Sequence, residues 1–530
     1  MTITGSITKV VVAAFAAVLI AALVAPAQVP AAAGHDGLTL TSRHQGSPVG
    51  GDGFLATATG PADERTADQA PGGRALAHYA GGVIPRARAI QKRAPVAELH
   101  PTGTQAAEPT LGIDKDGTMF YIGIEGPYTN TPFGQAAVSI ESRVMRSDDS
   151  GKKWTEVSPM VGPQRRHAVV NFDPMLYVDE DTGRVFTADL QAIACSTVSF
   201  SDDKGTSWTT SQACGLSDHQ HVFAGPPAVS QTIGYPNVVY YCAIDGGALA
   251  AFGTMTSCLK SLDGGLTWTR TGSPAFTNDP TQEHGQLGVP GHCGGGTGHG
   301  VVDDKGTIYL PRGWCGQPYL GISKDEGRTW NRVQVADNGM PYDTSSELDE
   351  HEAGVAVDKQ GNLYYTWTGR DRLLYLATSA DGGKTWSEPK MIGHPKVKEA
   401  WGPTIALGAS GKIAVAYIGS TDAPGGKAPQ GRGKGYKGST WNGYITMTDE
   451  ALKKDPLFFS GSVNDPRDPL VIGACPLIRC QHIMDFIDVA IAPDGTPWTS
   501  MGDGYNREGE PYPIFGLGFV GGMVGGPSLR

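Results

Sequence analysis

The sequence has few charged residues and no excess of basic ones, and both features narrow the classes of protein to consider. Only 18 % of the 530 residues are charged, below the roughly 25 % that is usual for soluble domains. Asp and Glu outnumber Lys and Arg by 53 to 42, for a formal net charge of −11. The chain therefore lacks the basic face that a nucleic-acid partner requires. With 39 % hydrophobic residues, it can bury a large core and is not disordered as a whole.

Sequence stretches suited to long helices are also scarce. The chain contains 74 Gly and 37 Pro, and Gly is about twice as frequent as in an average protein. Both residues interrupt helices, because Gly costs backbone entropy and Pro lacks the N–H donor. The composition therefore predicts a turn-rich, all-β fold.

A single long apolar run lies near the N-terminus. Lys9 precedes 15 apolar residues, Val10 to Val24, and Ala25-Pro26-Ala27 follows as a cleavage site of the A-x-A type. A membrane span needs roughly 20 apolar residues, and no Cys follows the run to carry a lipid anchor. We therefore interpret residues 1–27 as a signal peptide.

This interpretation sets the expected location and domain organisation. Residues 28–100 are rich in Ala, Gly, Pro, Thr and Asp without periodicity, which predicts a disordered leader or pro-segment. Residues 101–530 form the expected folded domain. We expect a secreted, extracellular monomer with no membrane span once the signal peptide is removed.

The eight cysteines form four pairs that are local in sequence. Their separations are 19, 16, 22 and 5 residues. An even number of cysteines in an exported protein predicts structural disulfides. The expected pairs are Cys195–Cys214, Cys242–Cys258, Cys293–Cys315 and Cys475–Cys480.

One octapeptide, Ser-x-Asp-x-Gly-x-x-Trp, recurs five times with Trp-to-Trp intervals of 54, 60, 62 and 56 residues. A second motif, an Asp/Gly turn between two apolar strands, occurs in each copy and in two further modules without an intact octapeptide. Seven modules of four short strands are typical of a β-propeller. The octapeptides span Ser147–Trp154, Ser201–Trp208, Ser261–Trp268, Ser323–Trp330 and Ser379–Trp386.

These octapeptides resemble Asp boxes (BNR repeats), and residues 101–530 resemble the sialidase-like β-propeller superfamily. The resemblance implies a seven-bladed β-propeller with Asp-box hairpins, with six blades, as in true sialidases, as the alternative. It also implies that the boxes lie away from the active site and that their carboxylates are structural. These are Asp149, Asp203, Asp263, Asp325 and Asp381.

Candidate chemistry lies in the loops at the opposite end of the channel, where the chain enters each innermost strand or leaves the second strand. Loops on a rigid scaffold often carry function, and eight of the 13 His fall in the predicted entering loops: His167, His219, His221, His284, His292, His299, His351 and His482. The candidate catalytic residues are Glu108, Asp173, His221, His299, His351, Glu352, Glu399 and Asp485. The candidate substrate contacts are Arg312, Arg370, Trp314, Trp401 and Tyr505.

Cleavage of glycosidic bonds in an extracellular glycan is the leading functional hypothesis, by a sialidase-like glycoside hydrolase or by another glycosidase with two carboxyl groups across the channel as acid and base. The strict sialidase signature is not matched, because Glu108 stands where the family's Arg-Ile-Pro motif places its Arg. A polysaccharide lyase, with Arg312 or Arg370 neutralising a uronate and a His or Tyr505 as base, is the alternative. A non-catalytic propeller that binds glycan or protein is the third.

Two features leave further alternatives open. The acidic residues among these candidates would also suit Ca²⁺, although no EF-hand loop is present. Residues 419–440 form a long loop rich in Gly, Lys and Arg. It is either a cover that attracts an acidic glycan or a solvated insertion.

Overall fold

The computed structural model describes residues 78–79, 95–125, 128–131, 134–137, 141–168, 173–191, 194–245, 255–279, 293, 296–340, 353–423, 439–470, 486–503 and 517–530. All of them belong to one compact unit, Ser42–Arg530. The predicted signal peptide and most of the predicted leader lie outside the described residues. No helix in the described part of the chain is long and apolar enough to cross a membrane.

Seven antiparallel sheets follow one another along the chain, and we number them blades 1 to 7. Blade 1 contains β3 (Thr110–Ile113), β4 (Met119–Glu125), β7 (Glu141–Ser147) and β8 (Thr155–Glu156). Blade 2 contains β11 (Met175–Val178), β12 (Val185–Gln191), β13 (Cys195–Ser201) and β14 (Thr209–Cys214). Blade 3 contains β15 (Ser217–Gly225), β16 (Val238–Asp245), β17 (Met255–Ser261) and β18 (Thr269–Arg270).

The next three blades repeat this order. Blade 4 contains β19 (Val301–Val302), β20 (Ile308–Trp314), β21 (Gln317–Ser323) and β22 (Asn331–Gln334). Blade 5 contains β23 (Gly354–Val357), β24 (Leu363–Thr368), β25 (Leu374–Ser379) and β26 (Lys390–Met391). Blade 6 contains β27 (Glu399–Ala409), β28 (Lys412–Ser420), β29 (Trp441–Thr448) and β30 (Leu457–Ser462), with β1 (His78–Tyr79) added outside β30.

Blade 7 joins the two ends of the folded domain. It contains β31 (Asp488–Ile491), β32 (Pro497–Asp503) and β33 (Leu517–Val524), and its outermost strand is β2 (Val96–Gln105), which pairs antiparallel with β33. Two hairpins, β5 (Tyr128–Thr131) with β6 (Gly134–Ala137) and β9 (Met160–Val161) with β10 (Arg166–His167), lie outside the blades. The first five residues of β2 lie within the segment that the sequence analysis assigned to the leader, so the propeller begins at Val96 rather than at residue 101.

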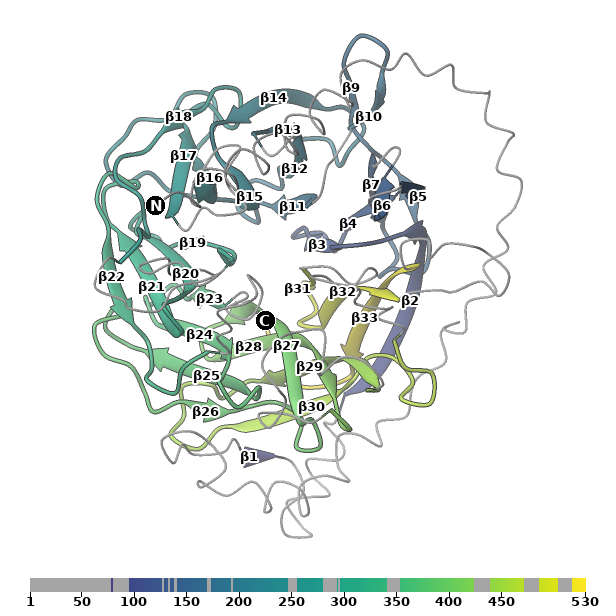
Figure 1. Ribbon diagram of the computed structural model, residues 1–530, viewed down its shortest axis with the longest axis vertical. Coiled ribbons are helices and arrows are strands. Elements are labelled where there is room, and N and C mark those ends of the chain that lie inside the picture. Colours follow the sequence, from purple (N-terminus) through teal and green to yellow (C-terminus); the bar gives the residue numbers. More distant parts are fainter. Residues whose placement is uncertain are drawn as a thin grey trace, which may run out of the picture. The chain divides into compact units, whose positions relative to one another are not determined.

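The innermost strands form a closed ring. Each contacts the innermost strand of the next blade, and β31 of blade 7 contacts β3 of blade 1. Figure 1 shows the blades arranged around this ring. The prediction of an all-β, seven-bladed β-propeller is confirmed.

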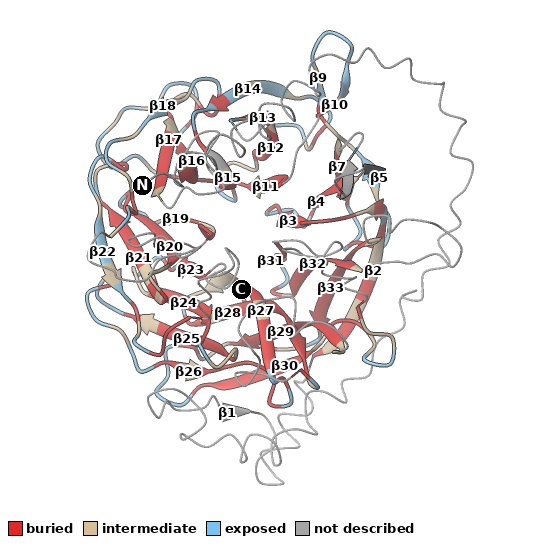
Figure 2. Ribbon diagram, in the orientation of Figure 1, coloured by how far each residue is buried: buried red, intermediate tan, exposed pale blue. Residues whose placement is uncertain are grey.

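The hydrophobic core lies between blades, because both faces of each sheet are covered by its neighbours. Phe120 and Val144 of blade 1, for example, pack against Leu176 and Val185 of blade 2. Figure 2 shows buried residues along the inner strands of the blades and exposed residues in the turns and in outermost strands such as β14 and β22. Burial on both faces explains why the strands are apolar with little alternation.

The five octapeptides form closely similar turns at the ends of the third strands. In the first, the Ser147 hydroxyl donates to Asp149 Oδ1 (2.9 Å) and accepts the Gly151 N–H (2.9 Å), and the Lys153 N–H donates to Asp149 Oδ1 (2.8 Å). The fourth residue of the octapeptide, directly before its Gly, has a left-handed φ in every copy. The values are 60° at Ser150, 57° at Lys204, 72° at Gly264, 57° at Glu326 and 71° at Gly382. The hydroxyl and carboxylate thus satisfy the backbone N–H groups of a tight turn.

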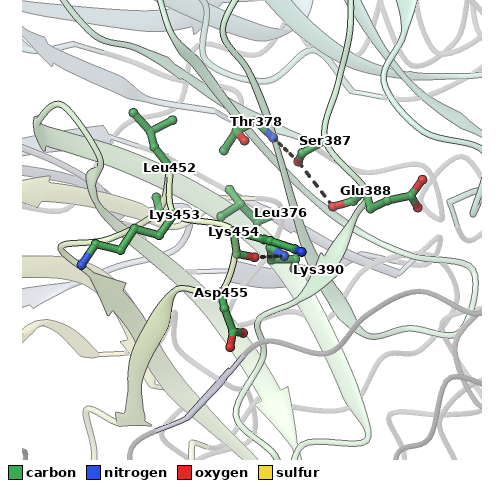
Figure 3. A pocket seen from close by; sticks show the side chains of 10 residues that line it. Leu376, Thr378, Ser387, Glu388, Lys390, Leu452, Lys453, Lys454 and Asp455 are labelled. Atoms are coloured by element: carbon green, nitrogen blue, oxygen red, sulfur yellow. Dashed lines mark hydrogen bonds between the residues drawn. The ribbon is translucent and has the colours of Figure 1, made fainter.

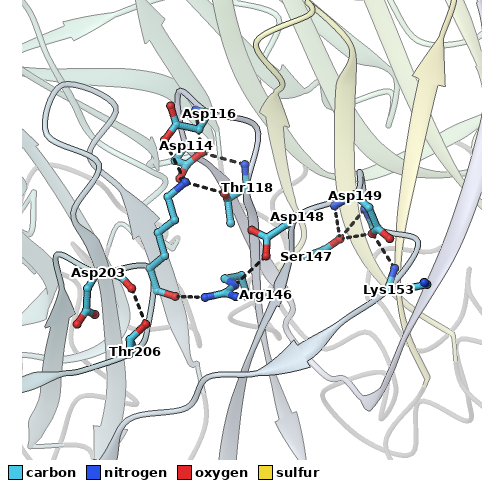
Figure 4. A network of polar contacts seen from close by, with 12 residues as sticks. Asp114, Asp116, Thr118, Arg146, Ser147, Asp148, Asp149, Lys153, Asp203 and Thr206 are labelled. Carbon is cyan, nitrogen blue, oxygen red and sulfur yellow. Dashed lines mark hydrogen bonds and ion pairs between the residues drawn. The ribbon is translucent and has the colours of Figure 1, made fainter.

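The residue with left-handed φ in the second turn also links neighbouring blades. Lys204 Nζ lies 3.1 Å from Asp114 Oδ2 and 3.0 Å from Asp116 Oδ2, both in blade 1. Arg146 of blade 1 donates in return to the Lys204 carbonyl (3.1 Å) and pairs with Asp148. Figure 4 shows this network between blades 1 and 2.

Three of the four predicted disulfides are confirmed. They are Cys195–Cys214, Cys242–Cys258 and Cys293–Cys315. The first two join neighbouring strands within a blade. Cys475 and Cys480 lie outside the described residues, so their pairing stays a prediction. Disulfides agree with an oxidising compartment.

Candidate functional site

One end of the channel is formed by the residues at or just before the starts of the innermost strands. The chain adopts an unusual backbone conformation there: φ is 50° at Glu108, 60° at Asp173, 57° at Asp218 and 48° at His219. Non-glycine residues rarely adopt positive φ, and such strain concentrates at functional sites. We call this end of the channel the mouth.

Glu108 and Asp173 are linked at the mouth. The Asp173 N–H donates to Glu108 Oε2 (2.6 Å), and Asp173 Oδ2 accepts the His219 N–H (3.2 Å). The Gln220 side chain donates to the Asp173 carbonyl. Glu108, Asp173 and Gln220 are fully buried, so the two carboxylates join blades 1, 2 and 3 through backbone donors.

His221, also fully buried, forms the next link. Its Nε2 lies 2.5 Å from the Thr297 carbonyl, which can only accept, so Nε2 carries the proton. Burial is the main cause that lowers the pKa of His221 well below 6.5, and the nearby His299 and His219 rings act in the same direction. His221 is therefore neutral at physiological pH.

His299 lies against His221 and is the more accessible of the two. Their ring centroids are 4.2 Å apart, and 27 % of the His299 side chain is exposed to solvent. Its Nε2 is 4.0 Å from Asp488 Oδ2. His299 and Asp488 thus bring blades 4 and 7 together at the mouth.

Asp488 was not among the candidates from the sequence. Its carboxylate accepts the Leu111 N–H of blade 1 and the Thr404 hydroxyl of blade 6, each at 3.4 Å. Burial raises the pKa of Asp488, and the nearby His299 acts to lower it. The sequence does contain a signal for this residue: Asp488 directly precedes the apolar run Val489-Ala490-Ile491. It lies three residues after Asp485, the residue that the sequence analysis predicted instead.

Two glycines allow the segment before β19 to approach this cluster. A Cβ on Gly296 would lie 2.7 Å from His219 Nδ1, and one on Gly298 would collide with the Ala353 carbonyl. Neither position has room for a side chain. The segment that carries Thr297 and His299 is therefore held close to blades 3 and 5.

Arg312, a predicted substrate contact, is fully buried. Its guanidinium donates to the Thr256 hydroxyl (2.5 Å) and the Cys293 carbonyl (3.4 Å), and its Cζ lies 5.5 Å from the Phe276 ring centroid. These protein groups surround it, so Arg312 is not accessible to a substrate in this structure.

Arg370 lies in blade 5, just after β24, and Glu399 lies at the start of β27 in blade 6. Glu399 is buried and pairs with Arg372 (3.2 Å). Arg370 is exposed, and its guanidinium comes so close to Gly339 that a Cβ there would lie 3.0 Å from Nε. Arg370 therefore offers an accessible cation, unlike Arg312.

The two predicted tryptophan contacts are half-buried. Trp314 Nε1 donates to the Thr277 carbonyl (2.9 Å), and its ring meets Tyr319 edge-on at 4.9 Å and has Arg332 above it at 5.2 Å. Trp401 packs against the core between blades 6 and 7. Both rings are engaged in packing within the protein.

The structure thus brings four predicted residues, Glu108, Asp173, His221 and His299, into one chain of contacts. Within the described residues, no group of three or more His, Cys, Asp or Glu side chains is arranged to hold a metal ion, so Ca²⁺ binding stays a prediction. The other predicted site residues lie outside the described residues: His351, Glu352, Asp485 and Tyr505.

No family model and no curated protein matches the chain. Among solved structures, it is similar to the NanB sialidase from Streptococcus pneumoniae, at 12 % identity over 80 % of this chain and 69 % of that one (TM-score 0.40). It is also similar to an α-L-arabinofuranosidase from Fusarium graminearum, at 14 % identity over 67 % and 97 % (TM-score 0.35). The Aleuria aurantia lectin matches at 12 % identity over 69 % and 97 % (TM-score 0.37). At such identities and scores, these similarities assign no activity.

Proposed function

We propose that the protein is a secreted carbohydrate-active enzyme that cleaves glycosidic bonds of an extracellular glycan at the mouth. His299 is the acid–base group, and Asp488 is its positioning residue. The observation that carries the proposal is the geometry of this pair: the His299 side chain is 27 % exposed, and its buried Nε2 lies 4.0 Å from a nearly buried carboxylate.

An imidazole is the side chain most often used for acid–base catalysis near neutral pH, and the Asp488 carboxylate lies 4.0 Å from Nε2 of His299. The neighbouring His221, whose ring centroid is 4.2 Å away, is neutral because burial lowers its pKa well below 6.5. A histidine in this position can donate a proton to a leaving oxygen or accept one from water or substrate.

Hydrolysis is the leading reaction, and it needs a second group on the other side of the bond. Besides Asp488, Glu108 and Asp173 are the described carboxylates linked to the histidines at the mouth, and both are buried and accept backbone N–H groups. In this proposal, they fix the position of the histidine segment. The sequence candidates for the second group are Glu352 and Asp485, both outside the described residues.

Elimination is the second candidate, and one observation favours it. Among the described candidates with ionisable side chains, the two that retain exposed surface are a histidine, His299, and a cation, Arg370. A lyase needs a base to remove the proton α to a uronate carboxylate and a cation to neutralise that carboxylate. Elimination would require an acidic glycan, whereas hydrolysis would not.

The test is incubation of the purified protein with a panel of acidic and neutral glycans. New reducing ends alone indicate hydrolysis, and new reducing ends with an ultraviolet-absorbing unsaturated uronate indicate elimination. Retention of a glycan without either product would assign a binding module and overturn the proposal.

Variants then test the roles of the pair. We expect His299→Gln to lower kcat by about 10²–10⁴-fold. Asp488→Asn should lower kcat with little change in KM, because His299 loses the carboxylate that positions its ring. His100→Gln is the matched control, since His100 lies on the outer strand of blade 7 beside Glu98 and should leave kcat unchanged. Full activity in His299→Gln would remove His299 from the mechanism.

A further inference from the structure

The mouth ends of blades 5 and 6 carry three cations that have no carboxylate partner among the described residues. Arg370 lies just after β24, and Lys396 and Lys398 lie in the segment that leads into β27. All three residues are exposed. The chain as a whole has a net charge of −11, so its composition does not predict a positive region here.

Backbone contacts hold the segments of these cations together at the mouth. The Ala400 N–H donates to the Arg372 carbonyl (2.8 Å), and the Lys398 N–H donates to the carbonyl of Ser420, the last residue of β28 (2.8 Å). Val397 is buried in the core between blades 5 and 6. The lysines on either side of Val397 are exposed, so the segment is anchored by one residue and presents its two neighbours to solvent.

The acidic residues of the same segments are already engaged by protein groups. Glu399 is buried and pairs with Arg372 (3.2 Å). Asp371 accepts the Tyr375 hydroxyl (2.8 Å). Asp422 is exposed, but its carboxylate accepts a serine hydroxyl (2.9 Å) and a backbone N–H (2.7 Å). These contacts occupy the nearby carboxylates and leave the three exposed cations available to an external anion.

The other end of the boundary between blades 5 and 6 has a different distribution of charge. Because β29 runs away from the mouth, the turn that follows it lies at that other end. A groove there is lined by residues 451–455 of this turn and by β25 and β26. Figure 3 shows Lys390 donating to the Lys454 carbonyl (2.8 Å), and Glu388 and Asp455 also line the groove. Both signs of charge are mixed in the groove, whereas the three unpaired cations lie at the mouth.

Unpaired, exposed ammonium and guanidinium groups bind carboxylates and sulfates through charge-assisted hydrogen bonds. Each exposed contact is weak, but a polymer with repeated acid groups can make several contacts at once, and the second and third are then intramolecular. A neutral glycan would gain nothing from these charges. The arrangement therefore favours a polymeric anion as the partner.

We propose that Arg370, Lys396 and Lys398 bind the acid groups of a polyanionic glycan and hold it across the mouth ends of blades 5 and 6. This inference rests on the proposed function and narrows its substrate to glycans that carry carboxylate or sulfate groups. The lysines are binding residues in this proposal and take no part in the chemical step.

Binding of the full-length protein to immobilised polysaccharides tests the proposal. Polygalacturonate supplies carboxylates, dextran sulfate supplies sulfates, and fully methyl-esterified polygalacturonate keeps the sugar without the charge. We expect retention by at least one acidic polymer at about 50 mM salt, release at about 0.5 M salt, and no retention by the ester. Retention by none of the polymers, or equal retention by the ester and the acid, would overturn the proposal.

A triple variant then tests the three cations themselves. It should bind the retained polymer at least about tenfold more weakly at low salt, and the difference should disappear at about 0.5 M salt. A control variant loses three other exposed cations, an arginine in the Asp box of blade 4 and two lysines beside the groove, and should change Kd less than about twofold. Equal Kd values for the two variants would refute the proposal. The test substitutions are Arg370→Gln, Lys396→Gln and Lys398→Gln, and the control substitutions are Arg328→Gln, Lys453→Gln and Lys454→Gln.

Cleavage assays on the same polymers separate this inference from the proposed function. Retention of an acidic polymer without cleavage would support binding by the cations and overturn the proposed enzyme activity. Cleavage confined to neutral glycans would leave the enzyme activity standing and overturn this inference.

Discussion

The most specific prediction from the fold concerns Glu326, which links blade 4 to blade 3. Its Oε1 accepts the N–H groups of residues 228–230 at 3.0, 2.9 and 2.8 Å. Its Oε2 lies 2.7 Å from Lys260 Nζ and also accepts the Ser230 hydroxyl. The carboxylate is fully buried, so these contacts replace all of its hydration.

The magnitude follows from the ionisation of this group. Burial alone would raise the pKa of Glu326, but the hydrogen bonds from Lys260, Ser230 and the backbone outweigh it and hold the pKa at about 2. Relative to an ordinary value of 4.5, this corresponds to about 3 kcal/mol in favour of the folded state. Because the pKa is lowered, this stabilisation is complete above about pH 4.5 and is lost as the pH falls toward 2.

The perturbation is Glu326→Gln, which keeps the shape and removes the charge. One amide oxygen can still accept the backbone N–H groups, but the NH₂ group then faces Lys260. We expect the free energy of unfolding at pH 7 to fall by about 2–4 kcal/mol, as for other buried ion pairs that lose one partner. Urea denaturation of the two proteins at a series of pH values from 7 to 2.5 measures the difference, which should shrink below about pH 4.5.

Two controls separate the local contacts from a general charge effect. Asp304→Asn removes an exposed carboxylate from the same blade and should change stability by less than about 0.5 kcal/mol. In a double-mutant cycle, Lys260→Met combined with Glu326→Gln should show a coupling of at least about 1 kcal/mol. A loss below about 0.5 kcal/mol for Glu326→Gln, or a loss that is the same at pH 2.5 and pH 7, would refute the reasoning.

Three further predictions test other parts of the scaffold. Burial raises the pKa of Asp189 to about 7, so stability should fall as the pH rises from about 4 to 7. Asp189→Asn should then be more stable than the parent at pH 8 by up to about 4 kcal/mol. Thermal denaturation at a series of pH values measures this difference, and a variant whose stability depends on pH in the same way as the parent's would contradict the prediction. Replacing Cys242 and Cys258 by Ala opens a loop of 16 residues and should cost about 3 kcal/mol, measured by urea denaturation without reductant. Lys204→Met removes a partly exposed ion pair with blade 1 and should cost about 0.5–1 kcal/mol, a loss that disappears in about 1 M salt if the contact is electrostatic.

The blade count could be predicted because the repeating turns are locally determined. In the turn that begins at Ser147, the hydroxyl, the carboxylate and the glycine all interact within eight residues. The closing strand β2 could not be predicted in this way, because its partner β33 lies more than 400 residues further along the chain. Pro101 and Gly103 also interrupt its pattern, and the pairing register shifts between Pro101 and Gln105.

The location of the mouth could be predicted, but the environment of each side chain could not. Glu108, Asp173, His221 and His299 were expected at one end of the channel because every innermost strand starts there. Burial depends on which segments pack over each residue, and sequence alone does not show that. The enclosure of Arg312 by Thr256 and the Cys293 carbonyl brings together segments about 20 to 60 residues apart in the chain, and no local motif marks it.

A ring of strands places the starts of all its innermost strands together, so convergence of polar residues at the mouth follows from the topology alone. The informative property is what each group contacts after convergence. Glu108 and Asp173 accept backbone N–H groups and Glu399 pairs with Arg372, contacts that offset the cost of burying a charge and fasten neighbouring blades. His299, in contrast, is partly exposed and has a carboxylate 4.0 Å away. Contacts that only hold neighbouring blades together do not require a partly exposed histidine. The acid–base chemistry should therefore be sought first at His299, and the buried carboxylates should be tested first for their effect on stability.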